Sequence, residues 1–350
     1  MEASPLLAKF PFQPRIQVGT WRWFKVVLLL PVVLARLLSA IIVLAVGRLF
    51  AMAGCIVVVR LCLRLVLFIF GFYWIEVVDR RSVPCGLATT SRVIVANHVG
   101  YFDMWAIVAY LGCGVVVAEG TLSLPLLGPC LASLGCVSVN RGTQSGRDIA
   151  KTDLLARIAD EALPPLLVFA EGCTSNDEVL CLFRQGAFLP GLPVQPLFIR
   201  YPNCCVDFYH GRGGGSGLGT LLYQLSQVYN RQHITMLPVV EPTLGEPASE
   251  FAERVRNGMA RAMGVSLVDY SYAGVRLCMT ARRLGLTRLA LTAHEAKRKL
   301  GLSVHDLEEL MERFASTLQD QHTDAAPSLE SYVHQRAQGR KEGVAAAKEQ

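Results

Sequence analysis

The segment Asn97-His98-Val99-Gly100-Tyr101-Phe102-Asp103 decides both the fold and the site that we expect for this chain. It follows the β-branched run 92–96 and precedes the apolar, helix-like run 104–111. This order predicts His98 at the carboxyl end of a buried strand and Asp103 at the start of a helix, where open α/β sheets place reactive groups. A histidine beside a carboxylate is the minimal pair of base and orienting group. The alternative is that His98 only ends the strand and Asp103 only caps the helix.

The chain around this segment alternates between short apolar runs and longer helical ones. We expect strands at 115–118, 136–139, 165–170, 194–200 and 234–239, and helices at 103–112, 125–134, 145–163, 218–230 and 248–263. Such alternation predicts an α/β fold, a mostly parallel sheet with flanking helices. Gly211 to Gly219 is rich in glycine but lacks the G-K-[ST] of a P-loop, so we interpret it as a flexible loop.

Two long apolar runs, 24–47 and 49–75, precede the globular part. Each exceeds the roughly 20 residues that cross a bilayer, so we predict a membrane helical hairpin with a linker near Gly47-Arg48. A buried pair of core helices is the alternative, and the length of the apolar stretch disfavours it.

Three arginines, Arg36, Arg60 and Arg64, interrupt these runs. A charge at the bilayer centre is costly, which favours a shallow hairpin whose arginines reach one interface over two full spans. Basic residues flank the hairpin on both sides, so both of its ends are expected to face the cytosol.

The predicted domain organisation follows from these composition changes. It comprises an N-terminal cytosolic segment (1–23), the membrane hairpin (24–75), an α/β domain (76–272), a C-terminal helical segment (273–319) and a partly disordered polar tail (320–350).

Composition limits the class of protein further. The chain is 52% hydrophobic, and its net charge of +6 suits an anionic membrane surface or an anionic ligand. Nucleic acid is not an expected partner, because no basic motif interleaved with aromatic residues occurs. The 11 cysteines are scattered without a C-x-x-C pair, which predicts reduced thiols and neither a zinc site nor a disulfide framework.

Four blocks follow one another in the α/β part. They are Asn97 to Asp103, Gly135 to Arg141, Phe169 to Asn176, and Leu192-Pro193-Val194-Gln195-Pro196. Taken alone, each has an ordinary explanation: Arg141 as a solvated charge at a strand end, Glu171-Gly172 as a turn, and Pro193 as an edge-strand residue.

Together and in this order, the blocks resemble the four motifs of the glycerophospholipid (1-acylglycerol-3-phosphate O-acyltransferase) superfamily. The Glu171-to-Asn176 segment, Phe183 to Phe188 and Arg200-Tyr201-Pro202-Asn203 resemble its lysophosphatidylcholine acyltransferase-like branch. The resemblance covers about 93–272 and implies the glycerolipid acyltransferase fold behind the apolar hairpin. Ala170 and Cys173 replace the usual proline and threonine, and the branch's calcium-binding C-terminal extension is missing.

The resemblance implies transfer of a fatty acyl group from acyl-CoA to the free hydroxyl of a lysophospholipid. It implies a membrane enzyme, on the cytosolic face of the endoplasmic reticulum, that needs no cofactor beyond acyl-CoA as co-substrate and no metal. The implied catalytic residues are His98 as the general base and Asp103 as its orienting carboxylate. The implied substrate-binding residues are Arg141, which clamps a phosphate, with Glu171, Gly172, Cys173 and Ser175, while Asn97, Gly186 and Pro193 have structural roles near the site.

Other readings stay open at this point. Within the superfamily, the acceptor is alternatively lysophosphatidic acid. From other classes, the chain is alternatively a catalytically inactive membrane scaffold of the same fold, or a membrane-anchored α/β hydrolase. The hydrolase would need a G-x-S-x-G elbow, and Gly215-Ser216-Gly217 lies in the glycine-rich run, which disfavours it.

Overall fold

The computed structural model describes residues 21–81, 91–139, 144–202, 206, 208–209 and 217–269. All of these belong to one compact unit that ends at Asp269. The predicted C-terminal helical segment (273–319) and polar tail (320–350) lie outside the described residues, as does nearly all of the N-terminal segment (1–23).

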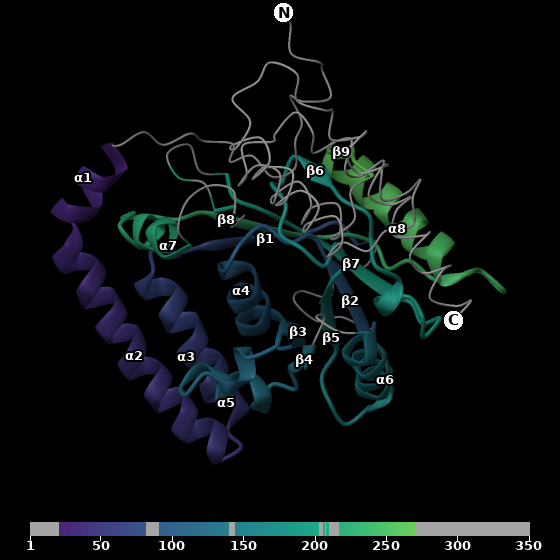
Figure 1. Ribbon diagram of the computed structural model, residues 1–350, viewed down its shortest axis with the longest axis horizontal. Coiled ribbons are helices and arrows are strands. Elements are labelled where there is room, and N and C mark those ends of the chain that lie inside the picture. The colour runs from purple at the N-terminus through teal and green to yellow at the C-terminus, as the bar shows by residue number, and fades with distance from the viewer. Residues whose placement is uncertain are drawn as a thin grey trace, which may run out of the picture. The chain divides into compact units, whose positions relative to one another are not determined.

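The described residues alternate between helices and strands, as the sequence predicts (Figure 1). The helices are α1 (Trp21–Leu28), α2 (Leu30–Met52), α3 (Ile56–Ile69), α4 (Phe102–Leu111), α5 (Leu127–Ser133), α6 (Gln144–Ala159), α7 (Gly217–Leu225) and α8 (Ala248–Met263), with 3-10 turns η1 (Thr121–Ser123) and η2 (Gln185–Ala187). The strands are β1 (Ile75–Asp79), β2 (Val93–Ala96), β3 (Gly114–Ala118), β4 (Val137–Val139), β5 (Leu166–Phe169), β6 (Val179–Leu180), β7 (Val194–Arg200), β8 (Gln232–Met236) and β9 (Ser266–Leu267).

Seven of these strands form one sheet in the order β1-β8-β7-β2-β5-β3-β4. Within it, the pairing of β7 with β8 is antiparallel and the other described pairings are parallel. Strands β6 and β9 make a separate parallel pair. The predicted fold class, a mostly parallel sheet with flanking helices behind an apolar N-terminus, is confirmed.

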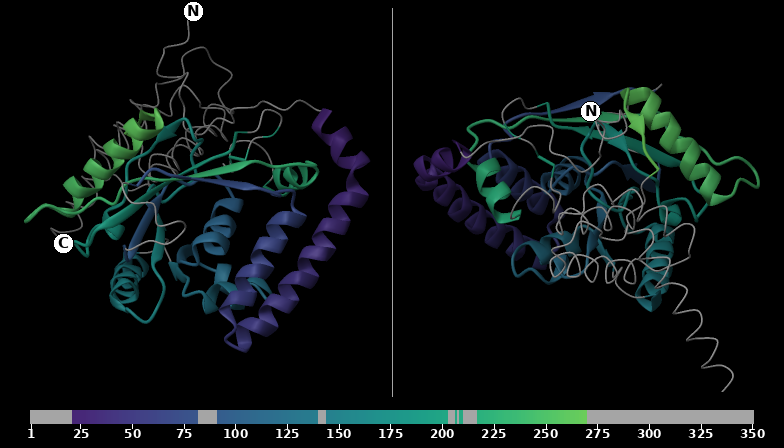
Figure 2. Two further views of the ribbon diagram at one scale, coloured as in Figure 1. Left: turned by 180° about the vertical axis from the view of Figure 1, so that it is seen from behind. Right: turned by 45° about the horizontal axis from the view of Figure 1, so that its top comes forward.

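The sheet is buried because helices cover both of its faces. Alternate residues of β2 and β5, such as Val93, Val95 and Leu166, join one core cluster with side chains of α6 and α8. Helices α3, α4 and α5 lie on the opposite side of the sheet from α8 (Figures 1 and 2). All four residues of β2 and all four of β5 are buried, as expected of central parallel strands.

Several element boundaries differ from the prediction, and for α7 and β8 the local reason is visible. Helix α7 ends at Leu225, before the predicted Asn230, and the hydroxyl of Ser226 instead donates to the carbonyl of Tyr223. Strand β8 begins at Gln232 and ends at Met236. Pro238 has no N–H to continue a ladder, so the predicted extension to residue 239 does not form.

The apolar N-terminal region forms the short helix α1 and two longer helices that lie side by side, α2 and α3 (Figure 1). The chain turns at residues 53–55, so the predicted linker at Gly47-Arg48 is wrong, and both residues lie inside α2. Gly47 is buried against Cys62 and Cys130, where a Cβ atom would lie 3.3 Å and 3.2 Å from their side chains. A close helix contact, and not a turn, therefore explains this glycine.

The hairpin arginines bind main-chain carbonyls of the α/β domain. Arg60 Nη2 donates to the carbonyl of Tyr110 at 2.9 Å, and Arg64 Nε donates to that of Ala109 at 3.1 Å. Both carbonyls belong to the last turn of α4, where unpaired acceptors and the helix dipole favour a cation.

Arg36 makes the equivalent contact with α7. Its Nη1 donates to the carbonyls of Leu225 at 2.6 Å and Gln227 at 2.5 Å, at the end of that helix. The sequence favoured arginines that reach the membrane interface, whereas the structure gives their charges partners in the domain, between 45 and 191 residues away along the chain.

Candidate active site

Three neighbouring strands bring the site together at one edge of the sheet. Strands β5, β2 and β7 are adjacent and parallel, so their carboxyl ends meet. His98 follows β2, Glu171 follows β5, and Tyr201 follows β7. The antiparallel strand β8 begins at this same edge and adds Gln232.

His98 and Asp103 form a direct hydrogen bond, with His98 Nδ1 2.8 Å from Asp103 Oδ2. Asp103 is fully buried, while a quarter of the His98 side chain is exposed. An ionised carboxylate only accepts, so Nδ1 carries the proton in the neutral imidazole and the Nε2 lone pair is available as a base. The ring of Phe169 stacks on His98 at 4.0 Å between centroids and fixes the ring plane.

The carboxylate of Asp103 also organises the loop that precedes α4. Its Oδ2 accepts from the main-chain N–H groups of Val99 at 2.6 Å and Gly100 at 2.9 Å. The residue in the N-cap position is Tyr101, and Asp103 lies in the first helical turn. Asp103 is therefore not a simple N-cap: its carboxylate connects the helix, the loop and the imidazole.

Glu171 is completely buried next to this pair. It accepts from the main-chain N–H of His98 at 3.2 Å, from Ser175 Oγ at 2.9 Å and from the main-chain N–H of Cys181 at 2.9 Å. Burial raises the pKa of the Glu171 carboxyl, and these hydrogen bonds oppose the rise. The contacts fix the His98 main chain, which fits a positioning function for this carboxylate.

The other predicted residues of the third block lie on two sides of the turn. Ser175 is buried against Glu171, whereas Gly172 and Cys173 line the cavity described below. Gly172 adopts a φ of +69°, which favours glycine, and a Cβ atom there would lie 2.4 Å from Arg184 Nε, so a larger residue would also displace that side chain. Hydrogen bonding to Cys173 and burial raise the pKa of the Cys181 thiol well above its ordinary value.

The predicted structural residues differ in their distance from the site. Asn97 is buried and its amide pairs with both main-chain groups of Ile199, at 2.7 Å and 2.9 Å, which ties the end of β2 to β7. Gly186 lies in η2, packed near Leu154, and Pro193 directly precedes β7. Arg141 lies outside the described residues, so its phosphate-binding role stays a prediction.

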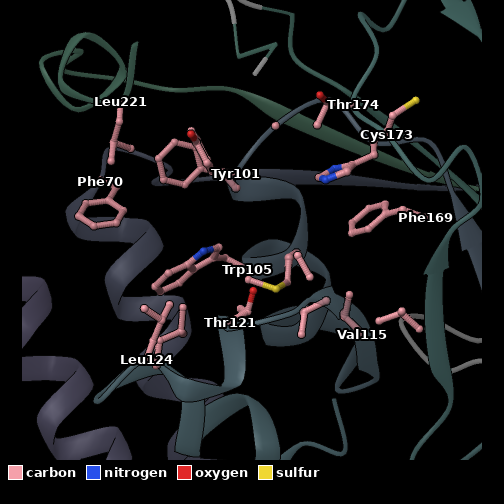
Figure 3. A pocket seen from close by; sticks show the side chains of 18 of the residues that line it. Phe70, Tyr101, Trp105, Val115, Thr121, Leu124, Phe169, Cys173, Thr174 and Leu221 are labelled. Atoms are coloured by element: carbon pink, nitrogen blue, oxygen red, sulfur yellow. The ribbon is translucent and has the colours of Figure 1, made fainter. Parts of the chain in front are cut away.

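A large apolar cavity of about 660 Å³ opens beside His98. Figure 3 shows Phe169 and Cys173 at one end of it and Phe70 and Leu221 at the other. His98 and Leu37 of α2 also line the cavity. Figure 3 shows Tyr101 and Trp105 between these ends, with Thr121 below Trp105. Ligand sites in proteins typically enclose about 300–1,000 Å³ and are mostly apolar. The cavity therefore suits an apolar ligand that reaches from the histidine to the hairpin.

Two buried residues of the site were missed in the sequence, Tyr201 and Gln232. Tyr201 Oη lies 2.5 Å from Asp103 Oδ1, and Gln232 Nε2 lies 2.9 Å from Tyr201 Oη. The position of Tyr201 directly after a predicted strand was a usable signal, but nothing in the sequence indicated that β8 begins beside it. Within the described part of the chain, no group of three or more histidine, cysteine, aspartate or glutamate side chains is arranged to hold a metal ion.

Comparison with known proteins identifies the class. Residues 75–200 match the family model described as Acyltransferase. This match and the relatives below confirm the predicted resemblance to the glycerophospholipid acyltransferase superfamily and to its lysophosphatidylcholine acyltransferase-like branch.

Two relatives show the extent of the similarity. The chain is 31% identical over 287 residues to lysophospholipid acyltransferase LPEAT2 of Arabidopsis thaliana, covering 77% of this chain and 52% of that protein. It is 30% identical over 258 residues to lysophosphatidylcholine acyltransferase 1 of Homo sapiens, covering 72% and 48%. Among solved structures, the LPA acyltransferase PlsC from Thermotoga maritima aligns with a TM-score of 0.43 at 17% identity, covering 65% of this chain and 96% of that one. The chain spans about half the length of the two relatives.

Proposed function

We propose that this chain is a membrane-bound, acyl-CoA-dependent acyltransferase that acylates the free hydroxyl of a lysophospholipid, lysophosphatidylcholine or a related lipid. The observation that carries the proposal is the His98–Asp103 pair, whose imidazole borders the apolar cavity. The base accepts the proton of the acceptor hydroxyl, and the cavity binds a fatty acyl chain. The names of the relatives, which are lysophospholipid and lysophosphatidylcholine acyltransferases, support the acceptor class.

The proposed reaction needs one base and no covalent enzyme intermediate. His98 Nε2 takes the proton of the acceptor hydroxyl while the hydroxyl oxygen attacks the thioester carbonyl carbon. The carbon–sulfur bond then breaks, and the departing CoA thiolate takes the proton from the imidazolium. Asp103 stabilises the positive imidazolium between these two steps. No cofactor besides the acyl-CoA co-substrate and no metal ion has a step in this scheme.

A direct assay tests the proposal. The full chain, purified in detergent, is incubated with labelled acyl-CoA and a panel of lysophospholipids, including lysophosphatidylcholine and lysophosphatidic acid. Labelled diacyl phospholipid is the expected product. A preference for lysophosphatidic acid would change the acceptor to the alternative within the superfamily. No transfer to any member of the panel, by protein shown to be folded, would indicate the inactive scaffold.

Blocking the cavity is expected to impair long acyl chains selectively. Thr121 borders the cavity beneath Trp105 (Figure 3), so Thr121→Phe fills part of the apolar space. We expect kcat/KM for long-chain acyl-CoA to fall by about tenfold or more, since pocket contacts of this size discriminate by 10–200-fold. Short-chain acyl-CoA should be affected much less. Ser123→Phe is the matched control, because Ser123 is exposed on the same turn. An equal loss for all chain lengths would contradict the assignment of the cavity to the acyl chain.

Arg141 is expected to bind a phosphate of one of the two substrates. Arg141→Lys keeps the charge but loses the two-pronged guanidinium contact. We expect kcat/KM for that substrate to fall by about 10–100-fold, the range of a hydrogen bond to a charged group. Steady-state kinetics with each substrate varied in turn identifies which one is affected. Unchanged kcat/KM for both would make Arg141 a solvated surface charge.

We further propose that the hairpin inserts from the cytosolic side and carries the domain on the membrane surface of the endoplasmic reticulum. Helix α2 has 23 residues, about 35 Å in length, and it alone among the described helices is long and apolar enough to cross a bilayer. Many of its apolar side chains are exposed, including Leu38, Ile42 and Leu49. The contacts of Arg60 and Arg64 with α4 hold α3 against the domain. Because α3 stays attached to the domain, we favour shallow insertion of the hairpin over two full spans.

Thiol labelling in sealed vesicles tests this topology. Native Cys55 lies at the hairpin turn and serves as one probe, with single cysteines at positions 10 and 80 as the others, each in a background lacking the other cysteines. A shallow hairpin predicts cytosolic access at positions 10 and 80 and no lumenal labelling of Cys55. Lumenal labelling of Cys55 would mean two full spans, and opposite sides for positions 10 and 80 would contradict the hairpin.

A further inference from the structure

The second oxygen of the Asp103 carboxylate has its own buried partner. Asp103 Oδ2 faces His98, and Oδ1 lies 2.5 Å from the hydroxyl of Tyr201. Asp103 is fully buried and Tyr201 is 1% exposed. Burial and the nearby negative charge of Asp103 raise the pKa of Tyr201 well above its ordinary value. The phenol therefore keeps its proton and donates it to the carboxylate.

Gln232 completes a chain of hydrogen bonds behind Tyr201. A phenol has one proton, and that of Tyr201 goes to Asp103, so its oxygen accepts from Gln232 Nε2 at 2.9 Å. Gln232 is fully buried. The chain runs from Gln232 through Tyr201 and Asp103 to His98, and it joins β8, the end of β7, α4 and the end of β2.

Tyr201 is held through both its main chain and its ring. The main-chain N–H of Tyr201 donates to Asp177 Oδ2 at 3.1 Å, and the ring stacks on Phe208 with 4.5 Å between centroids. The ring of Phe72 packs edge-on against the same ring, with 6.3 Å between centroids. A hydroxyl fixed in this way imposes one orientation on the carboxylate that it contacts.

We propose that Tyr201, held by Gln232, is a positioning residue that fixes the Asp103 carboxylate in the plane in which it binds His98. The inference rests on the proposed function, because the bond matters for transfer only if His98 is the base. An ordinary alternative is that the Tyr201 hydroxyl merely needs a partner when it is buried. The two explanations differ in whether loss of the hydroxyl reaches the His98 imidazole.

The test uses Tyr201→Phe, Gln232→Leu, the double variant, and Tyr229→Phe as a matched control on the exposed face of the molecule. One readout is steady-state kinetics with both substrates. The other needs no activity: ¹⁵N spectra of histidine-labelled protein, in which the loss of a signal in His98→Gln assigns the imidazole of His98. Thermal unfolding is measured for every variant.

We expect Tyr201→Phe to lower kcat about tenfold or more with KM for both substrates unchanged, and to shift the His98 imidazole resonances. Gln232→Leu should have a smaller effect on kcat that disappears in the Tyr201→Phe background, because both act through one oxygen. Tyr229→Phe should change neither readout.

Any of the following results would overturn the proposal. Unchanged kcat or unchanged His98 resonances in Tyr201→Phe would show that the hydroxyl does not position the imidazole. A fall in kcat that matches the loss of folded protein, or additive effects of Gln232→Leu, would leave only a structural role. If the unaltered chain transfers no acyl group, the proposed function fails, and the His98 resonances still decide whether Tyr201 orients the imidazole.

Discussion

His98→Ala should lower acyl transfer by about 10²–10⁴-fold or more, the contribution of a general base, while the fold and membrane association stay intact. In the proposed mechanism the His98 side chain, which borders the cavity, is the base, and its removal leaves the acceptor hydroxyl protonated. Only a quarter of the His98 side chain is exposed. We still expect the fold to stay intact, because the contact with Glu171 uses the main-chain N–H of His98 and not the imidazole. The measurement is transfer of labelled acyl groups in detergent, beside thermal unfolding and membrane fractionation.

His233→Ala is the matched control for this experiment. His233 is partly exposed on β8, pairs with Glu76 and is not among the residues that line the cavity. This variant should retain normal turnover. Turnover near that of the unaltered chain by His98→Ala would contradict the mechanism, whereas equal losses in both variants would point to damage to the fold.

The sequence predicted the parts of this site that depend on local pattern. A β-branched run followed by His98 and a helix start located the base at a strand end, and Asp103 five residues later is near enough to reach it in space. The strands β3, β5 and β7 were likewise placed within a residue or two of their bounds. Short-range order of this kind follows from hydrophobic periodicity and flanking polar residues.

Contacts that depend on strand order were not readable in the sequence. Gln232 reaches the site because β8 runs antiparallel to β7, which brings the beginning of β8 to the edge where the parallel strands end. Arg36, Arg60 and Arg64 were interpreted through membrane energetics alone, because their carbonyl partners lie on helices that come much later in the chain. Both cases are long-range pairings that no local spacing encodes.

The sequence identified residues of the third block but did not indicate which of them are buried. Glu171 and Ser175 were predicted to bind substrate, on the resemblance to a family motif, and the structure buries both against each other. Of the same block, Gly172 and Cys173 border the cavity. Whether Glu171 contacts substrate or holds the His98 main chain can be separated by experiment, because the two roles affect different quantities.

Glu171→Ala should destabilise the fold as well as impair transfer. The change leaves three donors without their acceptor: the buried N–H of Cys181, the buried hydroxyl of Ser175 and the partly buried N–H of His98. Each buried donor without a partner costs about 1–3 kcal/mol, so we expect the free energy of unfolding to fall by about 3 kcal/mol or more. The midpoint of thermal unfolding should then drop by about 10 °C in a domain of this size.

Two variants sharpen the interpretation of this result. Glu171→Gln keeps one acceptor oxygen in the same space and should lose less stability than Glu171→Ala, while Glu178→Ala, at an exposed position nearby, should lose almost none. Normal stability of Glu171→Ala combined with a raised KM for the lysophospholipid would restore the direct substrate contact that the sequence predicted. A lowered midpoint with a lower kcat and an unchanged KM in the remaining folded protein would instead support an action on His98 through the main chain, because losing a group that binds the substrate in the ground state raises KM.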